Sequence, residues 1–210
     1  MSLHAPDSRK ISEILADLSA HGEGDRIRLG DLLAALGERA FGVMMLVLAL
    51  PNAIGLGAIP GISTVFGLPQ VVLALQMIVG RERPWLPQQL LDHSIARSDF
   101  VSVVAKSTPY LQKFERLLRP RWMALTSYIA ERLLGVGFLI LATIVSLPIV
   151  FGNQPPAIAM ALIALGMIER DGVIVILGLV TGVVAVAIAG VVVIGGAAAI
   201  YLIFTRLFGM

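Results

Sequence analysis

The sequence predicts an all-α, polytopic membrane protein with two repeated broken or re-entrant helical hairpins and additional amphipathic interfacial helices. Of its 210 residues, 57% are hydrophobic and only 14% are charged, whereas a soluble domain carries about a quarter charged residues. Charged residues are absent from three long stretches, residues 41–79, 133–168 and 173–204. The first two stretches share the same order of landmarks, which predicts an internal repeat.

Composition excludes several classes of function. The chain has no cysteine, so disulfides and thiolate metal sites are excluded. His4, His21 and His93 lie in polar segments without a shared ligand spacing, so neither a metal nor a cofactor is expected. The net charge of +2 comes with basic residues placed beside apolar stretches. This placement suits anionic lipid head groups and does not indicate nucleic acid.

Residues 1–37 are predicted to form short amphipathic helices at the cytoplasmic face or the interface. Ile11, Ile14, Leu15 and Leu18 have helical spacing, and a second helix is expected to begin near Asp31 as its N-cap. The two helices either lie on the membrane or pack together. The segment lacks the apolar core of a signal peptide, so we expect insertion through the internal helices.

Residues 38–83 form the first predicted membrane repeat. Two apolar arms flank a centre rich in proline and glycine, Pro51 to Gly61. The first arm is about half of the roughly 20 residues that span a bilayer, and Pro51 is not expected to continue its helix. The centre is either a loop between two ordinary helices or a re-entrant turn inside the membrane.

Residues 84–130 are predicted to be a polar, amphipathic connector. Trp85 and Trp122 lie beside arginines at the edges of apolar runs, as interfacial anchors do. The connector is too short and too apolar for an independent soluble domain.

Residues 131–172 form the second predicted membrane repeat, and residues 173–210 form a C-terminal membrane helix or helix pair. The charge-free run 173–204 would reach about 48 Å as one helix, against a hydrocarbon core of about 30 Å. It is therefore one strongly tilted helix or two helices broken near Gly195-Gly196. Gly178 and Gly182 form a GxxxG pair suited to close helix contact.

The two repeats share landmarks in the same order. Each begins with a Glu-Arg pair, continues with an apolar arm, a proline and an asparagine, and ends in a matching apolar run before an acid–base cluster. The landmarks are Glu38-Arg39, Pro51-Asn52, Pro60, Ala74–Ile78 and Arg81–Arg83 in the first repeat, and Glu131-Arg132, Pro148 with Asn153, Pro155-Pro156, Ala164–Ile168 and Glu169–Asp171 in the second. Interrupted hydrophobic segments at corresponding positions predict a substrate site where the halves meet. The placement of basic residues favours two repeats with the same orientation in the membrane, so that all the polar segments are cytoplasmic. The repeat architecture instead favours two repeats with opposite orientations.

Several motifs carry a family resemblance. They are Leu36-Gly37-Glu38-Arg39-Ala40-Phe41-Gly42, Leu50-Pro51-Asn52, Pro60-Gly61-Ile62-Ser63-Thr64, Gly80-Arg81-Glu82-Arg83-Pro84-Trp85-Leu86-Pro87, and Phe151-Gly152-Asn153 through Glu169-Arg170-Asp171-Gly172. With these motifs the chain closely resembles the ExoD family over nearly its whole length. The resemblance implies a bacterial membrane protein linked to exopolysaccharide synthesis and to tolerance of alkaline conditions. It implies no catalytic residues.

The candidate substrate-binding residues lie at the ends and centres of the repeats: Glu38, Arg39, Asn52, Ser63, Glu131, Arg132 and Asn153. The two arginines either offer bidentate contacts to a phosphate or a carboxylate, or anchor helix ends at the interface. Ser63 either donates to an anion at a helix N-terminus or caps that helix. Because no hydrolase, P-loop or paired-carboxylate motif is present, an enzyme is not expected.

Two functions are compatible with this pattern and with what the family resemblance implies. The first is a small transporter or flippase in the bacterial inner membrane, acting on an anionic lipid-linked carrier or on a proton or another cation. The alternative is a non-transporting adaptor that scaffolds polysaccharide-assembly enzymes. Membrane lipids are expected partners in both cases, nucleic acid is not, and the sequence leaves a homo-oligomer open.

Overall fold

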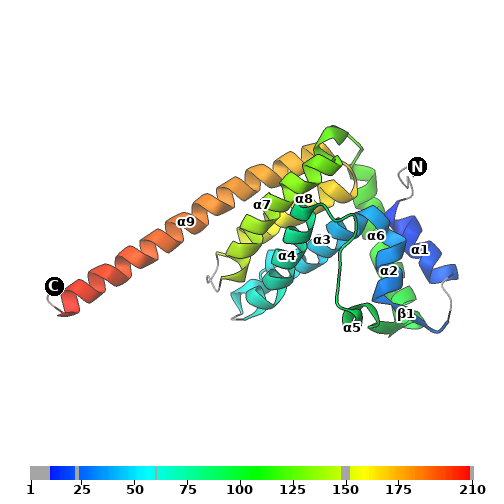
Figure 1. Ribbon diagram of the computed structural model, residues 1–210, viewed down its shortest axis with the longest axis horizontal. Coiled ribbons are helices and arrows are strands. Elements are labelled where there is room, and N and C mark those ends of the chain that lie inside the picture. Colours follow the sequence, from blue (N-terminus) through cyan, green and yellow to red (C-terminus); the bar gives the residue numbers. More distant parts are fainter. Residues whose placement is uncertain (1–9, 22–23, 60, 148–151, 209–210) are drawn as a thin grey trace. The chain divides into compact units, whose positions relative to one another are not determined.

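The structure is a computed structural model that describes residues 10–21, 24–59, 61–147 and 152–208 (Figure 1). The chain divides into two compact units. The first combines residues 1–40 with 83–119, and the second combines residues 41–82 with 120–210. The N-terminal segment and most of the polar connector, which the sequence presents as separate segments, thus belong to one unit.

The first unit is a small helical layer with a two-stranded sheet. Its elements are α1 (Ile11–His21), β1 (Arg26–Arg28), α2 (Leu29–Leu36), the 3₁₀ helix η1 (Gly37–Arg39), α5 (Gln88–Leu91), β2 (Ser94–Ala96) and α6 (Arg97–Leu117). β1 pairs antiparallel with β2, so that Ile27 lies opposite Ile95. Ile27, Phe100 and Val104 are buried together. Leu15 and Leu18 of α1 and Leu32 of α2 pack against this cluster. The N-terminal helices therefore pack with the connector, which the sequence analysis did not predict.

Two details of this unit differ from the sequence predictions. The strands were not predicted, because three residues are too few for an alternating pattern and each strand depends on a distant partner. Asp31 is not the N-cap of its helix. Arg28 is the cap residue, and Asp31 Oδ2 accepts a hydrogen bond from the Arg28 backbone N–H at 3.3 Å. Asp31 thus caps the helix from its third position, as in a capping box.

A buried carboxylate holds the start of α1. Glu115 of α6 accepts from the Ser12 backbone N–H at 2.9 Å and from Ser12 Oγ at 2.8 Å. The first N–H groups of a helix have no partner inside the helix, and the helix dipole favours a negative charge there. Glu115 therefore joins α6 to α1 where helix α1 most needs an acceptor.

Replacing Glu115 by alanine should destabilise the first unit by about 1–3 kcal/mol, because a buried N–H and a hydroxyl lose a charged acceptor. Thermal unfolding of the purified protein measures this change. The matched control is Gln112→Ala, which truncates an exposed side chain of the same helix. Equal unfolding temperatures for the two variants would contradict the assigned role.

The second unit consists mainly of apolar helices (Figure 1). Its elements are α3 (Ala40–Ala53), η2 (Leu56–Ala58), α4 (Ile62–Val79), η3 (Met123–Thr126), α7 (Tyr128–Ser146), α8 (Gln154–Ile168) and α9 (Gly172–Phe208). Contrary to the sequence prediction, Pro51 does not end the first arm, since α3 continues through it to Ala53. The predicted landmarks Pro60 and Pro148 lie outside the described residues.

In the two hairpins, α3–α4 and α7–α8, each helix packs against a helix of the other hairpin. α7 packs on α4: a Cβ on Gly135 would lie 3.0 Å from Met77, and Thr64 Oγ1 donates to the Ser146 carbonyl at 3.0 Å. α3 in turn packs on α8. A Cβ on Gly42 would lie 2.9 Å from Ile168, and Gln154 Nε2 donates to the Ala53 carbonyl at 3.1 Å. Each hairpin therefore contacts the other through both of its arms.

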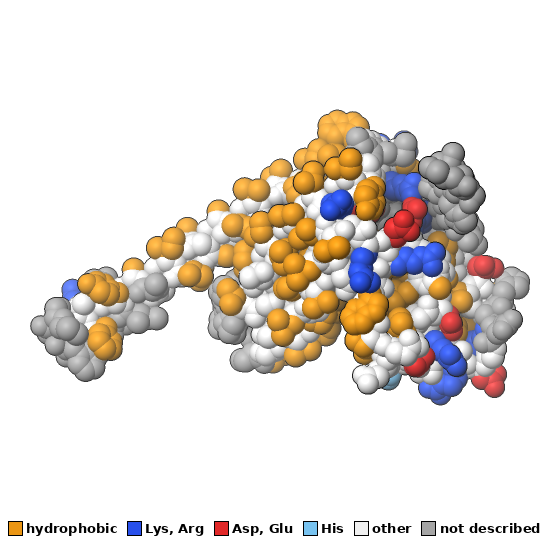
Figure 2. All heavy atoms as spheres, in the orientation of Figure 1, with side chains coloured by type: hydrophobic (Ala, Val, Ile, Leu, Met, Phe, Trp, Pro, Cys, Tyr) orange, Lys and Arg blue, Asp and Glu red, His pale blue; other side chains and the backbone are white. Residues whose placement is uncertain are grey.

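Four helical segments are long and apolar enough to cross a membrane: Leu29–Ala53, Ile62–Val79, Tyr128–Ser146 and Gly172–Gly196. Only a third or so of each apolar window is buried inside the protein. The exposed remainder includes Val65, Val72, Val136 and Val183. Figure 2 shows largely hydrophobic side chains along α7 and α9. Such continuous apolar surfaces indicate contact with lipid, and the prediction of an α-helical, membrane-associated chain is confirmed.

The C-terminal run is one continuous helix, so the alternative of two helices broken near Gly195-Gly196 is wrong. Gly178 and Gly182 make the predicted close contact. A Cβ on Gly178 would lie 2.7 Å from the Ile163 backbone nitrogen, and one on Gly182 would lie 3.4 Å from Leu141. Beyond this contact, Gly190 has no described atom within 4 Å of a Cβ position.

Candidate functional site

Buried polar side chains gather at the closed end of the first hairpin. Asn52, in the last turn of α3, is 0% exposed, and Ser63, in the first turn of α4, is 3% exposed. Both face Gly57 in the connection between the helices. A Cβ on Gly57 would lie 2.5 Å from Asn52 Oδ1 and 3.1 Å from Ser63 Oγ. Two side-chain oxygens therefore converge where glycine leaves room.

Local backbone geometry accounts for this convergence. Gly55 and Gly61 have left-handed φ angles of 95° and 90°, which other residues adopt only with strain. These turns reverse the chain within a few residues. The end of α3 and the start of α4 are thereby both brought beside Gly57.

The closed end of the second hairpin places Asn153 beside this region. Asn153 is 2% exposed and donates from Nδ2 to the Leu147 carbonyl at 2.9 Å. Its neighbour Gln154 donates to the carbonyl of Ala53, the residue after Asn52. Three of the predicted site residues, Asn52, Ser63 and Asn153, therefore lie where the hairpin ends meet.

Several buried amide atoms of this unit have no hydrogen-bond partner among the described residues. They are Asn52 Nδ2 and Oδ1, Asn153 Oδ1, and Gln70 Oε1, which lies about two helical turns beyond Ser63 on α4. An unsatisfied buried polar atom costs about 1–3 kcal/mol, and in lipid there is no bulk water to supply a partner. Such atoms indicate a functional requirement, such as a ligand, an ion or a held water.

Glu131 and Arg132 lie at the other end of α7, about 20 Å from the closed ends. Arg132 Nε donates to the Ile78 carbonyl at 3.0 Å, and Tyr128 Oη donates to the Gly80 carbonyl at 3.0 Å. Both bonds satisfy carbonyl groups at the C-terminus of α4, where a cation is also favoured by the helix dipole. The Arg132 side chain remains exposed.

Glu38 and Arg39 belong to the first unit, in η1 immediately before α3. Glu38 is exposed and Arg39 is half-buried. Within the second unit, the structure separates the remaining candidates into an uncharged group at the closed ends and a charged pair at the open ends.

Three contributors were not identified from the sequence. Gly57 is one of many glycines, and only its position opposite Asn52 distinguishes it. Tyr128 lies four residues before Arg132, without a recognisable motif. Asp171 was treated as part of a charged end cluster, yet it is 0% exposed and accepts from Arg121 Nη2 at 3.0 Å and from the Val173 N–H at 3.0 Å. It thus caps the start of α9 and holds residue 121 against it.

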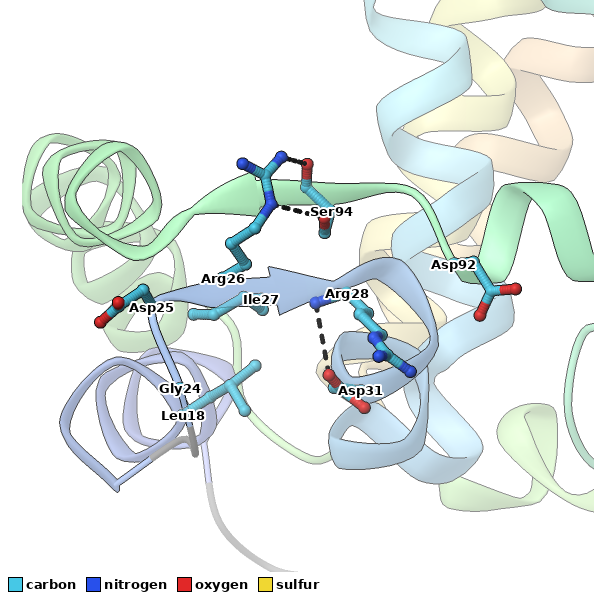
Figure 3. A pocket seen from close by; sticks show the side chains of 9 residues that line it. All are labelled: Leu18, Gly24, Asp25, Arg26, Ile27, Arg28, Asp31, Asp92 and Ser94. Atoms are coloured by element: carbon cyan, nitrogen blue, oxygen red, sulfur yellow. Dashed lines mark hydrogen bonds between the residues drawn. The ribbon is translucent and has the colours of Figure 1, made fainter.

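The first unit contains an open cavity of about 1040 Å³ (Figure 3). Its wall includes Arg26, Arg28 and Asp31. Arg26 is held by Ser94, to which it donates from Nε at 2.8 Å and from Nη2 at 2.7 Å, the second bond going to the backbone carbonyl. These bonds tie β1 to β2. Because its charged groups are of both signs, the cavity does not select a ligand class.

A metal centre is not indicated in the part of the chain that the structure describes. No three His, Cys, Asp or Glu side chains there lie close enough to hold an ion.

Comparison with known proteins identifies related sequences. Residues 11–191 match the protein family described as "Exopolysaccharide synthesis, ExoD". Protein ExoD of Rhizobium meliloti (strain 1021) is 34% identical over 180 residues, which cover 83% of this chain and 74% of that protein. An uncharacterized protein of Synechocystis sp. is 31% identical over 152 residues, covering 72% of this chain and 71% of that protein. No solved structure is significantly similar.

Proposed function

Since this chain belongs to the ExoD family, which is linked to exopolysaccharide synthesis, we propose that it moves an anionic lipid carrier across the bacterial inner membrane. In this proposal the protein is a multi-pass transporter or flippase rather than an enzyme. The observation that carries it is the set of buried amide atoms, near the hairpin ends, that have no hydrogen-bond partner in the described part of the chain. Coupling to a proton or another cation would connect the same step to alkali tolerance.

The packing of each hairpin on the other supports a pseudo-symmetric pair of repeats. The contact between Gly135 of α7 and Ile78 of α4 corresponds in the sequence repeat to the contact between Gly42 of α3 and Ile168 of α8. Repeated hairpins that pack on each other in this way enclose substrate sites at their interface in many transporters.

The length of α8 supports a re-entrant second hairpin, although the other arm of that hairpin, α7, is long enough to cross a membrane. α8 has 15 residues and reaches about 22 Å, short of the roughly 30 Å of hydrocarbon. A hairpin that contains α8 and enters from one face would end within the membrane. Irregular backbone at that depth is tolerated only where it lines protein or a water-filled site.

The charged residues at the open ends have a separate role in this proposal. In the second unit, Arg132 receives the phosphate of the carrier, which a guanidinium contacts at two points, beside Glu131. In the first unit, Arg39, beside Glu38, is a separate candidate contact for the same kind of head group. The uncharged site formed by Asn52, Ser63 and Asn153 is the gate through which the head group passes. A charge-free interior is consistent with transient rather than tight binding.

The alternative remains a non-transporting adaptor. The observation that favours it is the compactness of the first unit, whose charged surface would offer docking sites to polysaccharide-assembly enzymes.

Lipid vesicles distinguish the two functions. The full chain is reconstituted with a fluorescent isoprenoid phosphate, and an impermeant reductant is added outside. Without transport, only the outer half of the fluorescence is lost. We expect near-complete loss with the native protein, and at least about tenfold slower loss with Arg39→Lys or Arg132→Lys, because an ammonium loses the planar two-point contact that contributes about 1.5–3 kcal/mol.

The matched control is Arg206→Lys in the last turn of α9, which should leave the rate unchanged. Loss of only half the fluorescence with the native protein would favour the adaptor. Rates equal to that of the native protein for both Arg39→Lys and Arg132→Lys would rule out recognition of the carrier phosphate by these arginines.

A further inference from the structure

We propose that the closed hairpin ends bind a dehydrated monovalent cation of the size of Na⁺, with Asn52 Oδ1, Ser63 Oγ and Asn153 Oδ1 as ligands. The inference extends the proposed function. Only the role of the ion in transport rests on that function, whereas the binding of the ion does not. The binding site itself follows from the geometry of these residues.

The first step concerns the direction of the Ser63 hydroxyl. Ser63 Oγ donates its only proton to the Gly57 carbonyl at 2.8 Å. Its lone pairs are therefore the groups available toward Asn52. Asn52 Oδ1 is also an acceptor, and it has no partner among the described residues. In this orientation of the Asn52 amide, whose Nδ2 also has no described partner, two acceptors face the space over Gly57, and a cation or a donor completes the arrangement.

The second step concerns the other hairpin. Asn153 uses its Nδ2 on the Leu147 carbonyl, which fixes the amide and leaves Oδ1 as a further buried acceptor without a described partner. The bond between Gln154 and the Ala53 carbonyl holds this residue close to the end of α3. A third oxygen is thereby supplied from the second hairpin.

The third step concerns charge. The stretches 41–79 and 133–168 contain no ionisable residue, and the three ligands are neutral oxygens. Divalent cations are usually bound by carboxylates, whereas neutral oxygens and the negative C-terminal ends of interrupted helices bind dehydrated monovalent cations. α3 ends at Ala53, directly beside Asn52, so its dipole favours a positive charge there, whereas Ser63 and Asn153 lie at the N-termini of α4 and α8, whose dipoles oppose it. The acceptor oxygens, rather than the helix dipoles, therefore carry the argument for a cation.

The fourth step concerns space. Glycine at position 57 keeps the ligands accessible, because a Cβ would lie only 2.5 Å from Asn52 Oδ1. The absence of a side chain at position 57 therefore leaves the oxygens of Asn52 and Ser63 open to a bound ion.

Thermal unfolding of the full-length protein in detergent tests the site. Samples are compared in NaCl and in choline chloride at equal ionic strength. We expect the unfolding temperature to be about 3–6 °C higher when Na⁺ exceeds its dissociation constant tenfold. Equilibrium binding of radioactive Na⁺ should show one ion per chain.

Two variants locate the ion. Asn52→Leu should abolish both the temperature difference and the bound Na⁺ while remaining folded in choline chloride. Gln70→Leu is the matched control, since it removes another buried amide with an unpartnered oxygen, two helical turns farther along α4. It should retain both responses.

Equal unfolding temperatures of the native protein in the two salts, with no bound Na⁺, would overturn the proposal and leave a held water at the site. Retention of the response in Asn52→Leu would also overturn it. Because these measurements require no lipid movement, their failure is distinct from failure of the vesicle assay, which is run separately with Na⁺ on both sides.

Discussion

Replacing Asn52 by leucine should abolish function while raising the stability of the protein. The side chain is fully buried, and neither amide atom has a described partner. Leucine has the same branched shape as asparagine, although it is larger, and it has no polar atom, so the variant is relieved of about 1–3 kcal/mol of unsatisfied burial. A residue that destabilises the fold and is nevertheless present indicates a requirement of function.

Two measurements on one variant check this expectation. Thermal unfolding in detergent should show a higher transition temperature than the native protein, measured in choline chloride so that cation binding does not contribute. Complementation of a deletion strain, scored by polysaccharide output with protein level checked by immunoblot, should show loss of function. Normal polysaccharide output from Asn52→Leu would show that function does not require the buried amide. It would favour the non-transporting adaptor over the transporter.

Replacing Gly178 by alanine should destabilise the second unit by about 1–3 kcal/mol, the usual cost of forcing a group into a packed interface. The new Cβ would lie 2.6 Å from Ile163 Cγ1 and 2.7 Å from the Ile163 backbone nitrogen. Because one of these atoms is backbone, the clash is relieved only if α8 and α9 separate.

Gly190→Ala on the same helix is the matched control. Its Cβ meets no described atom within 4 Å, and alanine is a better helix former than glycine by up to about 1 kcal/mol. The two variants should therefore shift the unfolding temperature in opposite directions. A downward shift of similar size in both would mean that glycine is needed for flexibility of α9 rather than for its contact with α8.

The helices of the second unit were largely predictable from the sequence. Charge-free stretches correspond to membrane helices because charge is costly in hydrocarbon, and the Gly178/Gly182 spacing marked the helix face that makes close contact. Asn52 and Asn153 were identified because each lies near the broken centre of its repeat, and Ser63 because it follows Gly61 at the start of a predicted helix. The prediction that Pro51 ends its arm was wrong, because one missing N–H is tolerated near the end of α3, where few further bonds depend on it.

Other features depended on contacts that sequence patterns do not encode. Arg132 was identified as an anion ligand or an anchor, but its bond to the Ile78 carbonyl joins residues 54 positions apart. The strand pair joins residues 68 positions apart, as the bond between Arg26 and Ser94 illustrates. Gly57 carries no side chain and therefore no signal of its own. Such long-range pairs are set by tertiary packing, which local propensity does not determine.

The packing of each hairpin on the other has a consequence for how the protein is made. The first hairpin ends at Val79, and its partner α7 begins only at Tyr128, so at about 5–20 residues per second the ribosome needs roughly 2–10 s to supply it. During that interval the close-packing surfaces at Gly42 and Gly67 are inserted without the helices that cover them. The insertion machinery must therefore protect the exposed packing surfaces of the first hairpin until the second is made. A nascent chain stalled before Tyr128 should be a substrate for membrane quality-control proteases.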